Sequence, residues 1–128
     1  PGHPLLAHGS LSMKQLDGVA AALPDRSFGI RRLIEQAEGA ARVRLRVALE
    51  SDSLQLIKNV VASTDLVSFM PPMTFTRELA TGSLAAIDLQ GPVFAKASID
   101  VLTARGHEIS HAARRFLDFL VRAARRPD

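Results

Sequence analysis

The sequence contains no cysteine, which excludes disulfide bonds and cysteine-ligated metal sites. No apolar run approaches the roughly 20 residues that a membrane-spanning helix requires. Glycine-rich phosphate loops are also absent, so the common nucleotide-binding motifs are excluded. The N-terminal residues, which begin Pro1-Gly2, have neither the charged start nor the apolar stretch of a secretion signal. We therefore expect a cytoplasmic protein that does not associate with membranes.

The charge of the chain is modest, with a net value of +3 over 128 residues. Arginines are spread along the whole sequence with acidic residues among them, and this distribution argues against nucleic-acid binding by this segment. The apolar content of 47% and the charged content of 23% are ordinary for a globular protein. The length fits one domain or part of one.

The clearest pattern spans residues 43–72 and predicts a strand, a helix and a second strand. Apolar and more polar residues alternate through 43–50, as in a strand with one buried face. Residues 51–53, Ser-Asp-Ser, offer a side-chain oxygen to cap a helix, and Gln55 stands three residues after Asp52, at the spacing of a capping box. The second strand is predicted over 66–70, so we expect an α/β fold with a doubly wound, mainly parallel sheet. The side chains expected on the buried strand face are Val43, Leu45, Val47 and Leu49.

The rest of the chain continues this alternation of strands and helices, which is typical of a parallel sheet with covering helices. The other predicted elements are a strand over 19–23, a helix from 28 to about 37 that ends at Gly39, a helix over 73–80, strands over 84–89 and 93–102, and a helix capped by Ser110 that runs to about 124.

Six stretches of the chain follow one another in the order known from one protein family. They are His3-Pro-Leu-Leu6, Val19–Ile34, Glu50 with Val60-Val61, Leu66–Pro71, Glu78–Leu84 and Gly106–Leu120. In this order they resemble the effector-binding domain of LysR-type transcriptional regulators. The chain departs from the family at 63–65, where Ser-Thr-Asp stands in place of the usual Gly-x-Gly turn. The backbone there must avoid positive φ or accept it at Asp65.

The resemblance implies a fold like that of type 2 periplasmic binding proteins, in which two α/β lobes hold a small effector between them. Residues 1–91 would form most of lobe II, and residues 92–128 would form the return crossing strand and the last helix of lobe I. The winged helix-turn-helix through which such a regulator binds DNA would be absent from this chain. The expected partners are a small polar or anionic effector and a second copy of the regulator, in a dimer.

The loop Pro24–Phe28 is the best candidate for effector contact, because a strand end there meets the start of a helix. Free N–H groups and the partial positive charge of a helix N-terminus favour an anion. Ser27 can donate a hydroxyl, Arg26 can form paired hydrogen bonds with an acid, and Phe28 can stack on a ring. The alternative is that Asp25 and Ser27 only cap the helix while Arg26 points into solvent.

The same resemblance assigns Glu50, Met70 and Pro71 to the effector-binding cleft. Glu50 has an alternative role as the partner of an arginine on the predicted strand. That strand carries its arginines on one face, which is more typical of a solvated or protected edge than of a binding surface. The arginines are Arg42, Arg44 and Arg46.

No pattern predicts catalysis, so we expect neither enzymatic activity nor a cofactor. His107 and His111 are four residues apart, but no third metal ligand accompanies them. None of the serines lies in a Gly-x-Ser-x-Gly motif. The competing hypothesis is a stand-alone small-molecule binding module of the periplasmic solute-receptor type.

The last predicted helix has an apolar stripe that needs a surface to cover it. Burying such side chains is worth roughly 1.5–3 kcal/mol each. We therefore expect this helix to fold back on residues 1–91 or to dock onto a second copy of the chain. The stripe consists of Phe116, Leu117, Leu120 and Val121.

Overall fold

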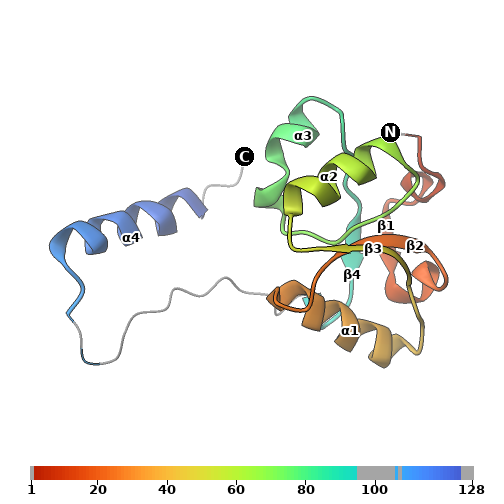
Figure 1. Ribbon diagram of the computed structural model, residues 1–128, viewed down its shortest axis with the longest axis horizontal. Helices are drawn as coiled ribbons and strands as arrows, with labels where there is room; N and C mark the ends of the chain where they lie inside the picture. Colours follow the sequence, from red (N-terminus) through yellow and green to blue (C-terminus); the bar gives the residue numbers. More distant parts are fainter. Residues whose placement is uncertain (1, 95–105, 107, 125–128) are drawn as a thin grey trace. The chain divides into compact units, whose positions relative to one another are not determined.

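The computed structural model describes residues 2–94, 106 and 108–124, and divides the chain into the units Pro1–Ala97 and Ser98–Asp128 (Figure 1). The first unit contains the strands β1 (Ser10–Ser12), β2 (Ala20–Pro24), β3 (Arg46–Ser51) and β4 (Asp88–Gln90), the helices α1 (Gly29–Ala41), α2 (Leu54–Ser63) and α3 (Thr76–Ala80), and the 3-10 helices η1 (Pro4–Ala7), η2 (Met13–Leu16) and η3 (Pro72–Thr74). The second unit contains α4 (His111–Ala124).

Both strand pairs of the first unit are parallel. β2 pairs with β3, and β1 pairs with β4. On its other side β2 forms a parallel bridge from Ala21 to Val67. α1 lies on one side of β2 and β3, and α2 and α3 lie on the other (Figure 1). This is the predicted α/β class with a parallel, doubly wound arrangement.

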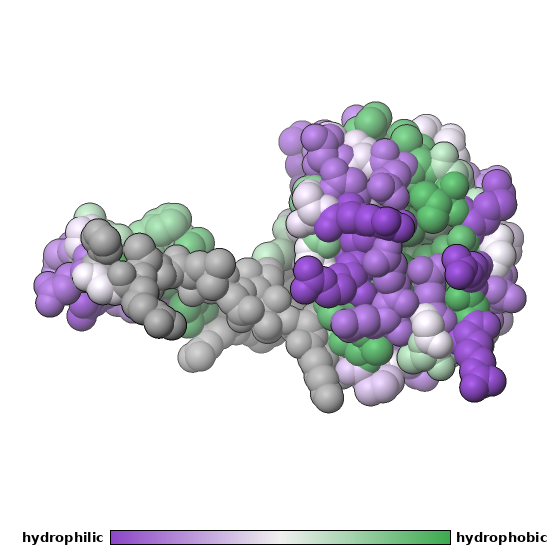
Figure 2. Space-filling view, turned by 60° about the horizontal axis from the view of Figure 1, so that its bottom comes forward, coloured by the Kyte–Doolittle hydropathy of each residue, from purple (hydrophilic) through white to green (hydrophobic). Residues whose placement is uncertain are grey.

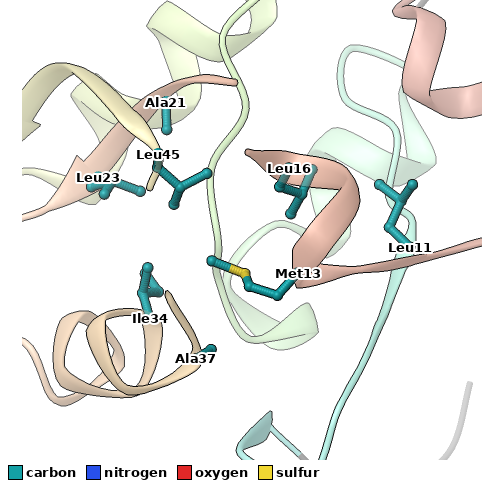
Figure 3. Packing of buried hydrophobic residues seen from close by; sticks show 8 residues of the cluster. All are labelled: Leu11, Met13, Leu16, Ala21, Leu23, Ile34, Ala37 and Leu45. Carbon is teal, nitrogen blue, oxygen red and sulfur yellow. The ribbon is translucent and has the colours of Figure 1, made fainter. Parts of the chain in front are cut away.

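The main core lies between α1 and the strands (Figure 3). Ala21 and Leu23 face α1 from β2, and both are fully buried. Met13 extends from η2 toward Ile34 of α1 in the same cluster (Figure 3). On the other side of the sheet, Ile57 of α2 is fully buried. The small residues of β2 therefore let a helix approach the sheet from each side.

The helices follow the sequence prediction, although their ends differ from it. α1 continues through Gly39 and ends at Arg42, whose φ of 56° is left-handed and whose N–H bonds to Glu38 and Gly39 carbonyls. α2 is capped by Ser53, whose hydroxyl oxygen accepts from the Leu56 amide at 3.2 Å. Ser53 is one of the three residues, 51–53, predicted to supply the capping oxygen, although the capping-box spacing had pointed to Asp52. The turn at 63–65 avoids positive φ.

β2 has the predicted length and is displaced by one residue, whereas the other predicted strands are shorter in the structure. β3 begins at Arg46, and the predicted buried face is wrong at Val47, which is 45% exposed. The reason is that β3 is paired on one side only within the described residues, while α1 packs over β2. The strand predicted over 66–70 is reduced to the single bridge at Val67, and that over 84–89 to β4. Most of the strand predicted over 93–102 lies outside the described residues.

α4 agrees with the sequence prediction in extent and in its cap. The Ala113 amide donates to the Ser110 hydroxyl oxygen at 3.2 Å. Hydrophobic residues are visible on the surface of this helix (Figure 2), and Phe116 is 60% exposed. What covers the stripe depends on how the two units are arranged, so its docking stays a prediction.

Candidate functional site

The carboxyl ends of β2 and β3 meet the starts of α1 and α2 at one edge of the first unit. The Asp25 amide, just past β2, donates to the carbonyl oxygen of Ser51 at the end of β3, at 3.0 Å. α1 then begins at Gly29, and α2 begins at Leu54. In parallel α/β folds this edge is where ligands bind, since helix N-termini and strand ends converge there.

The loop before α1 is held by its own hydrogen bonds. The Asp25 carboxylate accepts from the Ser27 amide at 2.8 Å and from the Ser27 hydroxyl at 2.6 Å. These two bonds, the hydroxyl bond first, hold the pKa of Asp25 below its usual value. The N-cap position is Phe28, whose side chain makes no capping bond. Asp25 and Ser27 therefore do not cap α1, whereas the other part of that alternative, Arg26 pointing into solvent, agrees with its exposed side chain.

The first turn of α1 consequently offers free donors. Within the described residues, the amides of Gly29 and Ile30 have no hydrogen-bond partner. A Cβ added to Gly29 would meet nothing within 4 Å, so the backbone there is accessible. Two unpaired N–H groups at the start of a helix of 13 residues form an anion-compatible site.

Two predicted residues of this loop have different surroundings. The Pro24 side chain is buried, and its carbonyl oxygen accepts from Arg31 at 3.3 Å. The Arg26 side chain is 79% exposed, and its Nε lies 3.4 Å from the Glu35 carboxylate. The Arg26 side chain is thus accessible to a ligand. The Pro24 side chain is not, so Pro24 contributes to the candidate site through its backbone.

Sequence reasoning missed Arg31, which is only 7% exposed. Its Nη1 donates to the Glu50 carboxylate at 2.8 Å, and its Nε donates to Glu35 at 3.2 Å. The sequence signal that could have found Arg31 is a cation in the first turn of a predicted helix, where the helix dipole disfavours positive charge. Glu50 therefore has an arginine partner, but it comes from α1 rather than from the strand.

Met70 and Pro71 follow a residue that is bridged to β2. Val67 forms a parallel bridge to Ala21, and Met70 and Pro71 come three and four residues after it. Both are half-buried. The predicted site residues therefore come from the loop before α1, from β3 and from the segment after Val67.

The three arginines predicted to share one face of a strand do not lie on the same strand. Arg42 ends α1, and Arg44 precedes the start of β3. Arg46 is the first residue of β3 and is exposed. All three lie at the amino end of this strand, away from the candidate site, and none has an ion-pair partner within the described residues.

Other site types gain no support in the described part of the chain. No group of three His, Asp or Glu residues there could hold a metal ion, and His107 lies outside the described residues. None of the described helices is long and apolar enough to cross a membrane. A surface hollow of about 330 Å³ is lined by Leu33, Gln36, Pro92 and Val93, none of which belongs to the predicted site.

Comparisons with known proteins identify the family of the chain. The profile of the LysR substrate binding domain matches residues 1–125. The HTH-type transcriptional activator CmpR of Synechocystis sp. (strain ATCC 27184 / PCC 6803 / Kazusa) is 25% identical over 118 residues, which are 92% of this chain and 38% of CmpR. The chain thus spans well under half the length of this relative.

Two solved structures share the fold. The Synechocystis PCC6803 CcmR regulatory domain, solved in complex with 2-PG, is 22% identical, with a TM-score of 0.74 over 97% of this chain and 59% of that chain. The effector binding domain of QuiR, solved in complex with shikimate, is 18% identical, with a TM-score of 0.68 over 95% of this chain and 56% of that chain.

These matches confirm the predicted fold class and the predicted family resemblance. The family is a domain of transcription regulators, which agrees with the prediction that the chain is not an enzyme. The profile covers nearly all of the sequence, and the chain belongs to the LysR substrate-binding domain family.

Proposed function

We propose that this chain is the effector-sensing part of a LysR-type transcriptional regulator, in which a small polar or anionic molecule binds between two lobes and controls transcription. The family match and the activator CmpR support this role. In this proposal residues 1–91 are most of lobe II, and residues 92–128 supply the return crossing strand and last helix of lobe I. The regulator works as a cytoplasmic dimer that binds DNA through a separate winged helix-turn-helix.

The candidate edge is one wall of the effector cleft in this proposal. The observation that carries it is the first turn of α1, where the free amides of Gly29 and Ile30 lie next to the ends of β2 and β3. An anionic group suits these donors. The residues proposed to line the wall are Pro24, Arg26, Ser27, Phe28, Glu50, Met70 and Pro71.

Known ligands of two relatives support a small effector. QuiR was solved with shikimate, which is a carboxylate, and CcmR was solved with 2-PG. Neither identity transfers to this chain, because both relatives are under 25% identical. Whatever the effector is, it changes the regulator only through different affinities for two arrangements of its subunits.

The test removes one free amide without disturbing the helix. Proline is tolerated at the first position of a helix, and Phe28 already has the extended backbone that precedes a proline, with φ −84° and ψ 133°. Gly29→Pro in the full-length gene product should weaken binding of an anionic ligand by about tenfold, the value of one hydrogen bond to a charged group. Gly29→Ala keeps the amide and is the matched control.

The binding assay is isothermal titration with shikimate, 2-PG and a panel of small carboxylates and phosphates. The proposal requires at least one anion to bind the unchanged protein and the Gly29→Ala variant more tightly than Gly29→Pro. Equal binding by Gly29→Pro would place the anion elsewhere.

A stand-alone solute-binding module is the second candidate, and the match to a transcriptional activator favours the regulator.

A further inference from the structure

Arg31 occupies a position that local preferences disfavour. It is the third residue of α1, where the helix dipole opposes a cation, and it is 7% exposed, where an unpaired charge is costly. Residues that violate local rules in this way are expected at functional or strained sites. The neighbouring Arg32 on the same helix is exposed, so the sequence does not need a buried arginine to form α1.

The guanidinium of Arg31 joins a helix to the ends of two strands. It donates to Glu35 in α1 at 3.2 Å, to the carbonyl oxygen of Pro24 in β2 at 3.3 Å and to Glu50 in β3 at 2.8 Å. The planar fork of an arginine side chain fixes the directions of such bonds. Arg31 therefore holds the Glu50 side chain against α1, beside the backbone bond from Asp25 to Ser51 that joins the two strand ends.

Glu50 is held by one oxygen only. Arg31 bonds to its Oε2, while the Glu50 side chain is 42% exposed. A carboxylate can accept up to about four hydrogen bonds. Its other oxygen, Oε1, has no partner within the described residues, and it belongs to the edge where the amides of Gly29 and Ile30 are also free. The edge thus combines donors for an anion with a fixed acceptor.

We propose that Arg31 is a positioning residue that presents Glu50 as a hydrogen-bond acceptor to the effector, and that the effector is an acid that also carries a hydroxyl or amino group. This inference rests on the proposed function and narrows its effector class. The acid group binds at the start of α1, and the hydroxyl or amino group donates to Glu50. Arg31 itself does not contact the effector.

The test measures which of two related ligands binds more tightly, in addition to the affinity of each. Full-length protein is titrated with paired carboxylates that differ by one hydroxyl: malate and succinate, lactate and propionate, and 4-hydroxybenzoate and benzoate. The variants are Arg31→Met, Arg31→Lys and Glu50→Gln, with Arg32→Met as the matched control. Amide hydrogen exchange of residues 25–28 and 50–53 is followed in the same proteins without ligand.

The unchanged protein and Arg32→Met should bind the hydroxylated member of at least one pair about tenfold more tightly, as one hydrogen bond to a carboxylate provides. Arg31→Met and Glu50→Gln should abolish this preference, and Arg31→Lys should restore part of it. Arg31→Met should also speed exchange in both segments. The Glu50 side chain is half-exposed, so we expect Glu50→Gln to fold. Its binding data therefore test the preference for the hydroxylated ligand even if Arg31→Met does not fold.

An unchanged preference in both Arg31→Met and Glu50→Gln, or no preference in the unchanged protein, overturns the inference. Unchanged exchange in Arg31→Met overturns the positioning role by itself. Failure of every anion to bind contradicts the proposed function instead, and the exchange result then still decides whether Arg31 positions the two segments.

Discussion

Among the described residues other than glycine, Arg42 alone has a positive φ, of 56°. It is the C-cap residue that follows α1. A left-handed conformation strains a residue with a Cβ by about 1–2 kcal/mol. Glycine relieves that strain but loses up to about 1 kcal/mol through the entropy of the unfolded chain. Arg42→Gly should therefore raise the free energy of unfolding by about 0.5–1 kcal/mol, measured by urea denaturation.

Arg44→Gly is the control for this substitution. Arg44 is exposed like Arg42, but its φ is not positive. Glycine there should lower the free energy of unfolding by about 0.4–1 kcal/mol. A loss of stability in Arg42→Gly equal to that in Arg44→Gly would contradict the account of how α1 ends.

The ion pair between Lys58 and Glu78 joins α2 to α3, with a separation of 2.7 Å. Both side chains are largely buried, at 13% and 19% exposure. The hydrogen bond from Lys58 holds the pKa of Glu78 below its ordinary value of 4.5. Because the folded-state pKa is the lower one, this contribution to stability is present above pH 4.5 and is lost as the pH falls through the folded-state pKa.

Glu78→Gln should therefore flatten the fall in unfolding free energy on acidification below about pH 4.5, because glutamine does not titrate. The measurement compares urea denaturation of both proteins at several pH values from 6 downward, with the difference between them as the readout. If the difference did not change with pH, Glu78 would not be a source of the acid sensitivity.

At the scale of elements, the start of α2 shows which of the predicted capping residues is used. The sequence offers residues 51–53 as caps, with the capping-box spacing at Asp52, and the structure uses Ser53. Ser53→Ala should lower the free energy of unfolding by about 1 kcal/mol, the usual value of a helix cap. Asp52→Ala, at an exposed residue whose side chain makes no bond within the described residues, should change it by less than about 0.5 kcal/mol. The reverse order of effects would make Asp52 the cap of α2 and contradict the role of Ser53.

Helices were predictable because their signals are local. The apolar spacing in 28–37 and the cap at Ser110 identify α1 and α4 with small errors at the ends. Strands depend on partners distant in sequence, so 66–70 reads as a strand although only Val67 bridges to β2. The candidate edge was predictable for the same reason that α1 was, since a loop before a helix is visible in the sequence.

The Arg31 network was not predictable from local patterns. Arg31 and Glu50 are 19 residues apart, and their contact depends on the register between β2 and β3. That register contains an irregularity between Ala21 and Ala22, which no periodicity indicates. The sequence and the family resemblance therefore suggest Glu50 as a candidate site residue without indicating Arg31 as its partner.

At the scale of the molecule, this chain covers 59% and 56% of the two solved regulatory domains and 38% of CmpR. The proposed cleft consequently needs a second wall from residues outside this chain. The division of the sequence into most of lobe II and the end of lobe I remains a proposal, as does the dimer. Binding experiments are therefore made with the full-length gene product.

The most direct test of the central claim is a residue-resolved titration of backbone amides by nuclear magnetic resonance. Full-length protein is titrated with the best anion from the binding panel. The account predicts that the largest shifts occur at residues 25–30 and 50–54, where α1 and α2 begin. Largest shifts at the amino end of β3, among residues 42–46, would contradict it, because the effector would then bind at the opposite edge of the sheet.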